Sequence, residues 1–344
     1  MQHPLPRIAI IGTGIAGLAC AAQLHAHAAV SLFDKSRGLG GRMATRRSEV
    51  ARFDHGVSRF SADGDFAAFL QPLIAAGSVA AWSPKTVRLS PQAGINQPRY
   101  AALPPRRQWV ASPGMSSLGR AVVAQYQFDA VHLGVTVSAL ETQPDQRMRL
   151  LADGQVYEDF DRVIIAMPPA QAAALLPHGA MRQACESVVM QPCHTLMLAA
   201  PSPTEVAWDI ALVDDPMVEI VIANHQKPSR DGSSAFVVQT NHQWSAQHID
   251  QPVADVGQLI QARLFELFAD SLAIEPLRDP ENLAYQSCHR WLYAAAATPL
   301  QNPQGFLFDA ASGLGVAGDW CLGTRVRHGF ASGTALGAAV KKSL

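Results

Sequence analysis

The sequence predicts an α/β fold, in which a domain built on a parallel sheet is interrupted by an inserted α+β domain with a mixed sheet. Three observations predict it. Residues 7–34 have the pattern strand, glycine turn, alanine-rich helix and strand, which is the unit that builds parallel sheets. Residues 79–109 contain five prolines and short alternating stretches, which indicate antiparallel strands and turns. After Gly305 the glycine- and alanine-rich style of the N-terminal part returns.

The first part of the chain supplies the parallel strands. We expect strands at Arg7–Ile11 and Val30–Phe33 on either side of a helix at Ile15–Ala28, whose small residues suit close packing on a sheet. The later elements expected here are helices at Asp65–Gly77 and Ser117–Ala124, strands at Val131–Leu140 and Met148–Leu151, a hairpin turn at Asp153-Gly154, and a buried strand at Arg162–Ala166 that Met167-Pro168-Pro169 ends before a short alanine-rich helix.

The middle of the chain supplies the mixed sheet. Apolar positions at helical spacing predict a helix at Val253–Phe268. The expected strands are Thr195–Ala199, Val218–Ala223, Ala235–Thr240 and Leu283–Trp291 in the middle, then Phe306–Phe308 and Leu314–Ala317, followed by a helix at Gly329–Val340. We therefore expect a discontinuous first domain (residues 1–75, 110–175 and 300–344) and an inserted domain (residues 76–109 and 176–299).

Composition excludes several classes of partner. The 344 residues are 48% apolar and carry a formal charge of −1, so no basic surplus favours nucleic acid or an anionic membrane. No apolar run is long enough to span a bilayer, and Met1–Pro6 lacks the basic start of a signal peptide. Five scattered cysteines without a CxxC pair favour a reducing compartment, so we expect a cytoplasmic protein. The histidines lack HExxH spacing, and we expect no metal site.

The first motif is Gly12-Thr13-Gly14-Ile15-Ala16-Gly17, between the first strand and its helix. Gly12 permits a tight turn, Gly14 lets a pyrophosphate approach the backbone, and Gly17 lets helix and strand pack closely. The N–H groups at Ile15 and Ala16 begin the helix and can bind an anion. Asp34, 20 residues after Gly14, can accept hydrogen bonds from adenosine ribose hydroxyls. The motif predicts a Rossmann-type dinucleotide site; the alternative is an ordinary glycine turn.

A second glycine loop, Gly38-Leu39-Gly40-Gly41-Arg42-Met43, follows Asp34 and Lys35. Gly40 and Gly41 allow the loop to run close under the diphosphate, and Arg42 can neutralise it with a forked donor pair. NAD enzymes have no general need for such a loop. The alternative is a solvated basic loop.

The third motif is Gly318-Asp319, which follows the apolar strand near the C-terminus. An acid there can bind ribityl or phosphate-side hydroxyls, and the following helix can direct its positive end at the pyrimidine edge of an isoalloxazine. Together the three motifs change the expected cofactor from NAD to FAD, held non-covalently. A thioether through Cys321 is the alternative.

These motifs, with several in the middle of the chain, resemble the renalase-like branch of the flavin amine oxidase superfamily. The resemblance covers essentially the whole chain in order. The motifs that carry it, besides the glycine loops and Gly318-Asp319-Trp320-Cys321-Leu322, are Phe53-Asp54-x-Gly56, Pro113-Gly114-Met115-Ser116, Val163-Ile164-Ile165-Ala166, Asn224-x-x-Lys227-Pro228-x-Arg230-Asp231, Gln243-Trp244-Ser245 and His289-Arg290-Trp291-Leu292-Tyr293-Ala294.

The resemblance implies a Rossmann-type FAD-binding domain and a substrate domain like that of p-hydroxybenzoate hydroxylase. It implies an oxidase that converts the 2- and 6-dihydro isomers of NAD(P) to NAD(P)+, with hydride passing to flavin N5 and O2 giving H2O2. The implied cofactor contacts are Lys35, Met43, Gly56, Val326, Arg327, Gly329 and, through backbone atoms near the adenine, Val135. The implied substrate contacts are Asn224, Gln243, Trp244, His289, Trp291 and Tyr293.

The chain departs from the family pattern twice. Gly56-Val57-Ser58-Arg59-Phe60 stands where the pattern reads Gly-Ala-Gln-Tyr-Phe, and Val326-Arg327-His328-Gly329 where it reads Val-Glu-Gly-Ala. A protonated His328 at the flavin edge would stabilise the anionic reduced flavin.

Hydride transfer needs no side-chain base, so the candidate catalytic residues are limited to Trp291, Tyr293 and His328. Two other functions stay open. One is an amine oxidase in which Trp291 and Tyr293 flank a small amine. The other is a flavin-binding protein without turnover.

Overall fold

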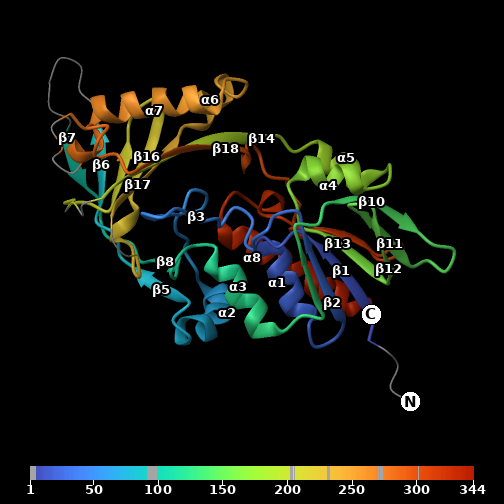
Figure 1. Ribbon diagram of the computed structural model, residues 1–344. Helices are drawn as coiled ribbons and strands as arrows, with labels where there is room; N and C mark the ends of the chain where they lie inside the picture. The colour runs from blue at the N-terminus through green and yellow to red at the C-terminus, as the bar shows by residue number, and fades with distance from the viewer. Residues whose placement is uncertain are drawn as a thin grey trace.

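The computed structural model describes the chain except residues 1–4, 91–98, 202–203, 205, 231–232, 270, 272–273 and 301. Asp231 of the quoted motif therefore lies outside the described residues. Two sheets dominate the molecule (Figure 1). A parallel sheet with helices packed against it is built from segments near both ends of the described chain, and a mixed sheet with one long helix lies above it in this view.

The parallel sheet has six strands in the order β19-β20-β13-β1-β2-β9. All of its pairs are parallel except β19 with β20. The first and last parts of the chain thus form one sheet, because β20 pairs with β13 at the end remote from β9. Its strands are β1 (Arg7–Ile11), β2 (Ala29–Asp34), β9 (Ala130–Leu133), β13 (Arg162–Ile165), β19 (Leu307–Asp309) and β20 (Leu314–Val316).

Both faces of this sheet are buried, which explains its continuous apolar strands. Ile8 and Ile10 pack in the core with the helices, whereas Ala9 and Ile11 pack in a second core with a three-stranded meander. The helices are α1 (Ile15–Leu24), α2 (Gly64–Ala75), α3 (Ser117–Tyr126) and α8 (Val326–Lys342); the meander is β10 (Val137–Thr142), β11 (Met148–Ala152) and β12 (Gln155–Phe160).

The second sheet is mixed, with seven strands in the order β18-β14-β17-β16-β15-β6-β7. Its pairs are antiparallel except β15 with β6. Helix α7 (Val253–Leu267) covers one face, and the other face joins the core of the parallel sheet through residues such as Met197 and Val237. The strands are β6 (Thr86–Ser90), β7 (Arg99–Ala102), β14 (Met190–Ala200), β15 (Ile210–Val213), β16 (Val218–Ala223), β17 (Ser234–Thr240) and β18 (Tyr285–Ala296).

Short elements connect the two sheets. The remaining elements are the paired strands β3 (Arg46–Arg47) and β4 (Arg52–Phe53), the paired strands β5 (Val79–Trp82) and β8 (Gln108–Ala111), helices α4 (Pro169–Leu175), α5 (Ala180–Glu186) and α6 (His242–Gln247), and the 3-10 turns η1 (Asn224–Gln226), η2 (Glu275–Leu277) and η3 (Asp319–Cys321). The mixed α/β fold class is confirmed.

Several predicted boundaries were wrong. The strand expected at Thr195–Ala199 begins at Met190, and the helix expected at Gly329–Val340 begins at Val326 and ends at Lys342. The strand expected at Val131–Leu140 is two strands in different sheets, because Gly134 adopts φ +71° and turns the chain between them. The first helix ends at Leu24 rather than Ala28, since residues 25–28 form the turn that leads into β2. The strand expected at Leu283–Trp291 continues to Ala296, which pairs with Met190 of β14.

The hairpin turn predicted at Asp153-Gly154 is present in the structure. Asp153 and Gly154 both have positive φ between the paired residues Ala152 and Gln155, as the Asp-Gly hairpin prediction requires. Strands sort between the two sheets in line with the proposed domain division, which stays a proposal. Among the described residues, no helix is long and apolar enough to cross a membrane.

Candidate functional site

The first glycine turn has the geometry of a phosphate-binding turn. Gly12 has φ +106°, and a Cβ there would lie 2.3 Å from the carbonyl oxygen of Ala166. A Cβ on Gly17 would lie 2.0 Å from the carbonyl oxygen of Gly12, so helix and turn are in direct contact. A Cβ on Gly14 would meet nothing within 4 Å. No side chain caps the start of α1, so its first N–H groups face this open space and fit a pyrophosphate.

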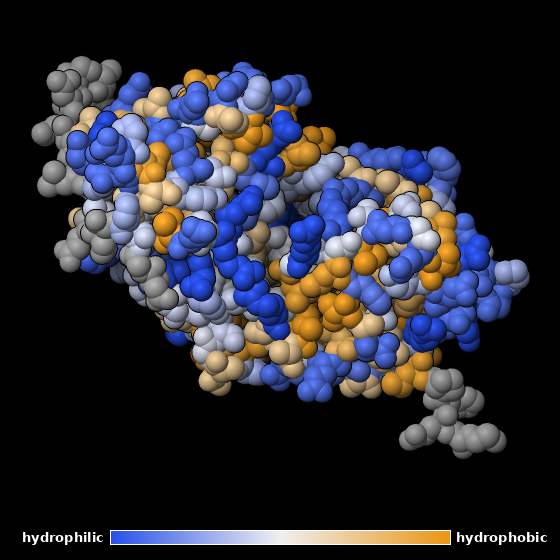
Figure 2. Space-filling view, viewed as in Figure 1, coloured by the Kyte–Doolittle hydropathy of each residue, from blue (hydrophilic) through white to orange (hydrophobic). Residues whose placement is uncertain are grey.

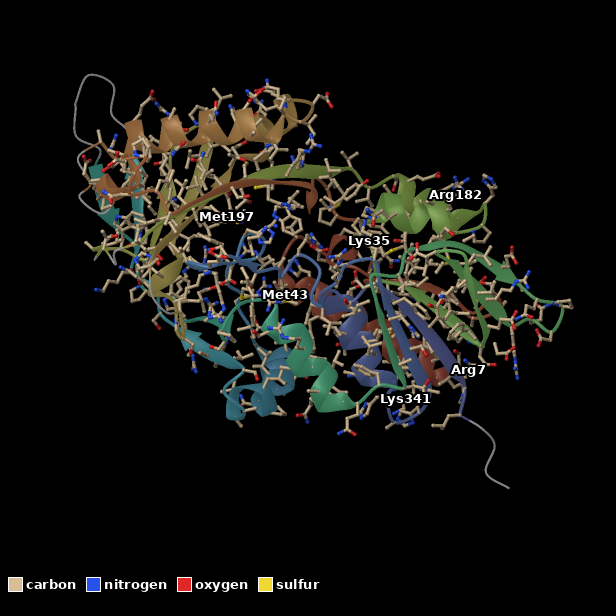
Figure 3. All side chains as sticks on the ribbon, in the orientation of Figure 1. Arg7, Lys35, Met43, Arg182, Met197 and Lys341 are labelled. Carbon is tan, nitrogen blue, oxygen red and sulfur yellow. The ribbon has the colours of Figure 1, made fainter. Side chains whose placement is uncertain are left out.

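The second glycine loop lies against the first. Gly40 donates its N–H to the carbonyl oxygen of Thr13 (3.0 Å), and a Cβ on Gly41 would lie 3.3 Å from the Cα of Gly14. Met43 ends this loop, and its side chain is buried in the core (Figure 3). A ligand at the loop would therefore meet the backbone of Met43. The two loops that the sequence assigned to one diphosphate are therefore neighbours.

Asp34 is held at the end of β2 by backbone and hydroxyl donors. Its Oδ2 accepts from the N–H (2.8 Å) and hydroxyl (2.6 Å) of Thr13, and its Oδ1 accepts from the N–H of Ser36 (2.8 Å). Val135 donates its N–H to the carbonyl oxygen of Asp34, so an adenine contact there would use the Val135 carbonyl oxygen. Lys35 is exposed and reaches Gln171 on α4 (3.3 Å; Figure 3).

The C-terminal motif meets both loops. Asp319 pairs with Arg42 of the second loop, and a Cβ on Gly329 would lie 2.7 Å from the Cγ2 of Ile15. Helices α1 and α8 are in close contact, because a Cβ on Gly333 would lie 2.0 Å from the carbonyl oxygen of Ala16. The start of α8 thus lies beside the start of α1. The three FAD motifs converge, and their residues fit the cofactor.

A cleft of about 400 Å³ lies between the two sheets, next to these loops. Its walls are the lower face of the mixed sheet, the loop 56–61, and residues 324–327 at the start of α8. Hydrophilic side chains gather along the centre of the molecule in this region (Figure 2). The charged residues that line it are Arg42, Arg59, Glu219, Arg325 and Arg327. The cleft is therefore strongly basic.

Trp291 of β18 is the predicted substrate residue that lines this cleft. Its Nε1 donates to the carbonyl oxygen of His55 (2.9 Å), and a Cβ on Gly56 would lie 3.0 Å from its Cζ2. His289 packs edge-on behind it, 4.5 Å between ring centroids, and also contacts His55. Tyr293 is half-buried and does not line the cleft. The flat wall is thus one indole ring, not the expected Trp291–Tyr293 pair.

The surroundings of both imidazoles behind Trp291 favour the uncharged ring. Burial, followed by the charges of His289 and Arg46, lowers the pKa of His55 to about 4. Burial and Arg46 also lower the pKa of His289. Gln239 supports the same loop from β17 by donating to the carbonyl oxygen of Gly56 (2.7 Å).

Three predicted substrate residues lie away from the cleft. Asn224 is fully buried: its amide donates to the carbonyl oxygen of Arg52 (2.6 Å) and accepts from Lys227 (2.8 Å), which leaves no surface for a ligand. Gln243 is exposed on α6, outside the cleft lining. Trp244 stacks on His248, 3.9 Å between centroids. The neighbouring His242 lines the cleft instead.

The middle motifs of the sequence meet in a buried ion cluster. Asp54 accepts from Lys227 (3.0 Å) and Arg230 (2.7 Å), and it also accepts from the N–H of Met115 (2.8 Å) and the hydroxyl of Thr45 (2.7 Å). All three charged side chains are at most 3% exposed. Residues from three distant segments therefore join the loop before Gly56 to the mixed sheet.

His328 turns toward its own helix end. Its Nδ1 accepts the N–H of Arg325, and its ring covers Gly323, where a Cβ would lie 2.0 Å from Nδ1. Partial burial, then Arg327 and Arg325, lower its pKa, which favours the neutral ring. Both observations speak against the expected protonated imidazole at the flavin edge. Val326 and Arg327, by contrast, line the cleft.

Two other expectations concern cysteine and metals. Cys321 is buried, and burial raises the pKa of its thiol to about 12, which disfavours the thiolate that a thioether bond requires. In the described part of the chain no group of three or more His, Cys, Asp or Glu side chains could hold a metal ion.

Two residues at the cleft, Arg325 and Gln239, have no local sequence signal, and Arg59 stands out in the sequence only as a departure from the family pattern. Arg325 precedes the last helix, but nothing in its immediate sequence distinguishes it from a solvated arginine. Gln239 lies on a strand whose register decides that its amide reaches Gly56. Both positions depend on tertiary contacts, which local patterns do not contain.

The chain matches two family models. One, described as flavin containing amine oxidoreductase, matches residues 66–339, and the other, described as NAD(P)-binding Rossmann-like domain, matches residues 10–73. Renalase from Mus musculus is 25% identical over 327 residues, which cover 88% of each chain.

Solved structures share the fold at low sequence identity. The putative protoporphyrinogen oxidase from Exiguobacterium sp. 255-15 superposes with a TM-score of 0.75 at 13% identity, covering 98% of this chain and 99% of that one. Cyclohexylamine oxidase from Brevibacterium oxydans IH-35A gives 0.73 at 12% identity with the same coverage.

Proposed function

The chain belongs to the flavin containing amine oxidoreductase family and is an FAD-dependent oxidoreductase, and on that premise we propose that it oxidises isomeric dihydronicotinamides, the 2- and 6-dihydro forms of NAD(P). When bound, FAD supplies the hydride acceptor at N5 and returns the electrons to O2, which becomes H2O2. The organic substrate loses a hydride and becomes NAD(P)+, so no proton has to be removed from it by a side chain.

The charge of the cleft carries this proposal. Four arginines and one carboxylate, that of Glu219, line it among the described residues. A dinucleotide is anionic and is attracted to such a wall, whereas an amine enters as an ammonium ion and is repelled. An amine must also lose a proton before oxidation, and the two histidines behind Trp291 hold their protons weakly in a fixed, buried cluster.

The chain's own residues have positioning roles in this proposal. The indole of Trp291, fixed by the carbonyl of His55 against Gly56, offers a flat apolar wall to a nicotinamide ring. Arg42 and the start of α1 hold the FAD diphosphate, and Asp34 holds its adenosine ribose. The five free cysteines, four of them buried, support a cytoplasmic location.

Anaerobic reduction of the holoenzyme tests the function. Purified protein with bound FAD is mixed with 6-dihydro-NAD, 2-dihydro-NAD, ordinary 4-dihydro-NAD or benzylamine, and absorbance near the flavin maximum is followed. We expect the 2- and 6-dihydro isomers to bleach the flavin fastest and NAD+ to appear in equal amount. Bleaching by benzylamine alone would favour the amine oxidase, and no bleaching by any donor would favour a flavin-binding protein without turnover.

A further inference from the structure

Within the part of the chain that the structure describes, two of the four arginines in the cleft lack a carboxylate partner. Arg42 is paired with Asp319, and Arg327 lies 3.7 Å from Asp63. Arg59 donates to the hydroxyl of Ser58 (3.1 Å), and over the described residues neither it nor Arg325 has an Asp or Glu oxygen within 4.0 Å. Arg59 and Arg325 therefore give the cleft positive charge that no neighbouring described carboxylate neutralises.

Arg59 and Arg325 come from different parts of the chain but lie in each other's field. Burial lowers the pKa of Arg59, and the charge of Arg325 lowers it further, although a guanidinium stays protonated in both environments. Two like charges on a partly buried wall repel each other and lose hydration, and an anion between them relieves both costs. Arg325 also precedes the 17-residue helix α8, whose N-terminal dipole favours an anion at the same place.

Arg59 and Arg325 line the same cleft as Trp291. Arg59 is three residues beyond Gly56, the residue against which the indole of Trp291 packs. Arg325 lines the same cleft, next to Val326 at the start of α8. A substrate whose flat ring rests by Trp291 would therefore carry an anionic group toward these two arginines.

We propose that Arg59 and Arg325 form an anion subsite that binds a phosphate of the substrate through their forked N–H donors. This rests on the proposed function, and it makes the phosphate a specificity determinant of this chain. The family pattern that the sequence resembles has tyrosine at position 59 and glutamate at 327, so the basic character of this wall belongs to this chain. The FAD diphosphate is a separate anion, served by Gly14, Gly41 and Arg42.

The test compares substrates with and without the phosphates. Holoenzymes of the wild type, Arg59→Gln and Arg325→Gln are reduced anaerobically by 6-dihydro-NAD and by 6-dihydronicotinamide riboside, which lacks phosphate. Each variant should lose about 10- to 100-fold in the reduction rate constant over Kd with the dinucleotide, as expected for a charge-assisted contact. With the riboside the loss should stay within about 2-fold. Arg182→Gln, on α5 away from the cleft (Figure 3), is the matched control and should behave as wild type.

A second measurement separates this proposal from the proposed function. Inorganic pyrophosphate is titrated into each oxidised holoenzyme, and the visible spectrum of the flavin reports binding. If no dihydronicotinamide reduces the wild type, the function fails, and weaker pyrophosphate binding by both variants still supports the subsite. Equal pyrophosphate affinity in wild type and variants overturns the subsite. So does equal loss with dinucleotide and riboside, or loss of bound FAD from both variants, which would assign the arginines to the cofactor.

Discussion

Arg42 uses its two terminal nitrogens to bind Asp319 and the carbonyl oxygen of Ala294 (2.8 Å). One side chain of the second glycine loop therefore joins the C-terminal motif to strand β18 of the mixed sheet. Asp319 is 7% exposed, so its charge depends on this partner. The same guanidinium lies beside the two glycine turns that fit a diphosphate, and it is placed to serve both anions.

Replacing Arg42 should weaken FAD binding. Arg42→Ala removes a charge-assisted contact and should raise the Kd for FAD by one to two decades, about 1.5–3 kcal/mol. It also leaves Asp319 unpaired, so the melting temperature of the apoprotein should fall. Fluorescence titration of apoprotein with FAD measures the first effect, and Asp319→Asn, which keeps Arg42, is the comparison. An unchanged Kd in Arg42→Ala would place this arginine outside the diphosphate site.

Alanine substitutions at two glycines of the first turn should affect different properties, FAD affinity in one case and stability in the other. Gly14→Ala adds a Cβ where nothing lies within 4 Å, at an ordinary φ of −66°, so the apoprotein should keep its stability. The same Cβ occupies the space of the pyrophosphate, and FAD affinity should fall at least tenfold.

Gly17→Ala is the matched variant. Its Cβ would lie 2.0 Å from the carbonyl oxygen of Gly12, so the apoprotein itself should be destabilised by about 1–3 kcal/mol. Urea unfolding of both apoproteins and FAD titration separate the two outcomes. Equal losses of stability in both variants would contradict the assignment of Gly14 to the ligand.

Local sequence patterns predicted the glycine loops, but they did not predict contacts between distant segments of the chain. The roles of Gly12, Gly14 and Gly17 follow from chain geometry within one strand–turn–helix unit, and for that reason the spacing alone predicted them. Three partners of Asp54, by contrast, lie 61 to 176 positions away in the chain: Met115, Lys227 and Arg230. Asn224 and Lys227 looked like substrate-domain motif residues, yet they stabilise the junction between the sheets. Tertiary packing determines which motif residues are free to bind a ligand and which stabilise the fold.

Acid should destabilise the protein through Asp54. Burial alone would raise the pKa of Asp54, but Lys227 and Arg230 outweigh it and hold this pKa at about 2, below the usual 3.8. Because the pKa is lower in the folded state, ionised Asp54 adds about 2 kcal/mol to the free energy of unfolding. This contribution is complete above about pH 4 and is lost as pH falls toward 2. Urea unfolding between pH 5 and pH 2.5 measures this loss.

Variants assign the acid effect to Asp54. Asp54→Asn leaves two buried cations, Lys227 and Arg230, without their carboxylate partner. It should lower the free energy of unfolding by about 3–5 kcal/mol at pH 7. Asp214→Asn removes an exposed carboxylate that also pairs with an arginine, and it should keep the acid profile of the wild type. Wild-type stability of Asp54→Asn at pH 7 would show that the cluster contributes nothing to the fold.

His328 should affect the helix rather than the flavin. Because its Nδ1 accepts the N–H of Arg325 and its pKa is lowered, the neutral form of the ring is favoured between pH 7 and 8. The flavin midpoint potentials of wild type and His328→Gly should therefore run together over this range. Loss of the cap should lower the free energy of unfolding by about 0.5–2 kcal/mol, and His328→Gln, which keeps an acceptor, should recover part of it. A potential gap that narrows as pH rises would restore a role at the flavin.

The error at His328 has a physical cause that the sequence did not display. A glycine five residues earlier leaves room for the ring: Gly323 has no Cβ, and the imidazole occupies that place. Likewise, Tyr293 follows Trp291 at the spacing that puts both on one face, but only the indole reaches the cleft wall. Neither outcome depends on residue type alone, because each depends on which neighbouring space is empty.

The contact between α1 and α8 also limits how the protein can be divided into fragments. Helix α1 spans residues 15–24 and α8 spans residues 326–342, and they meet where Gly333 packs on Ala16. Strand β20, which pairs with β13, likewise comes from the later part of the sequence. A fragment that contains the first glycine turn but lacks α8 therefore carries one side of the nucleotide-binding turn without the helix that packs beside it.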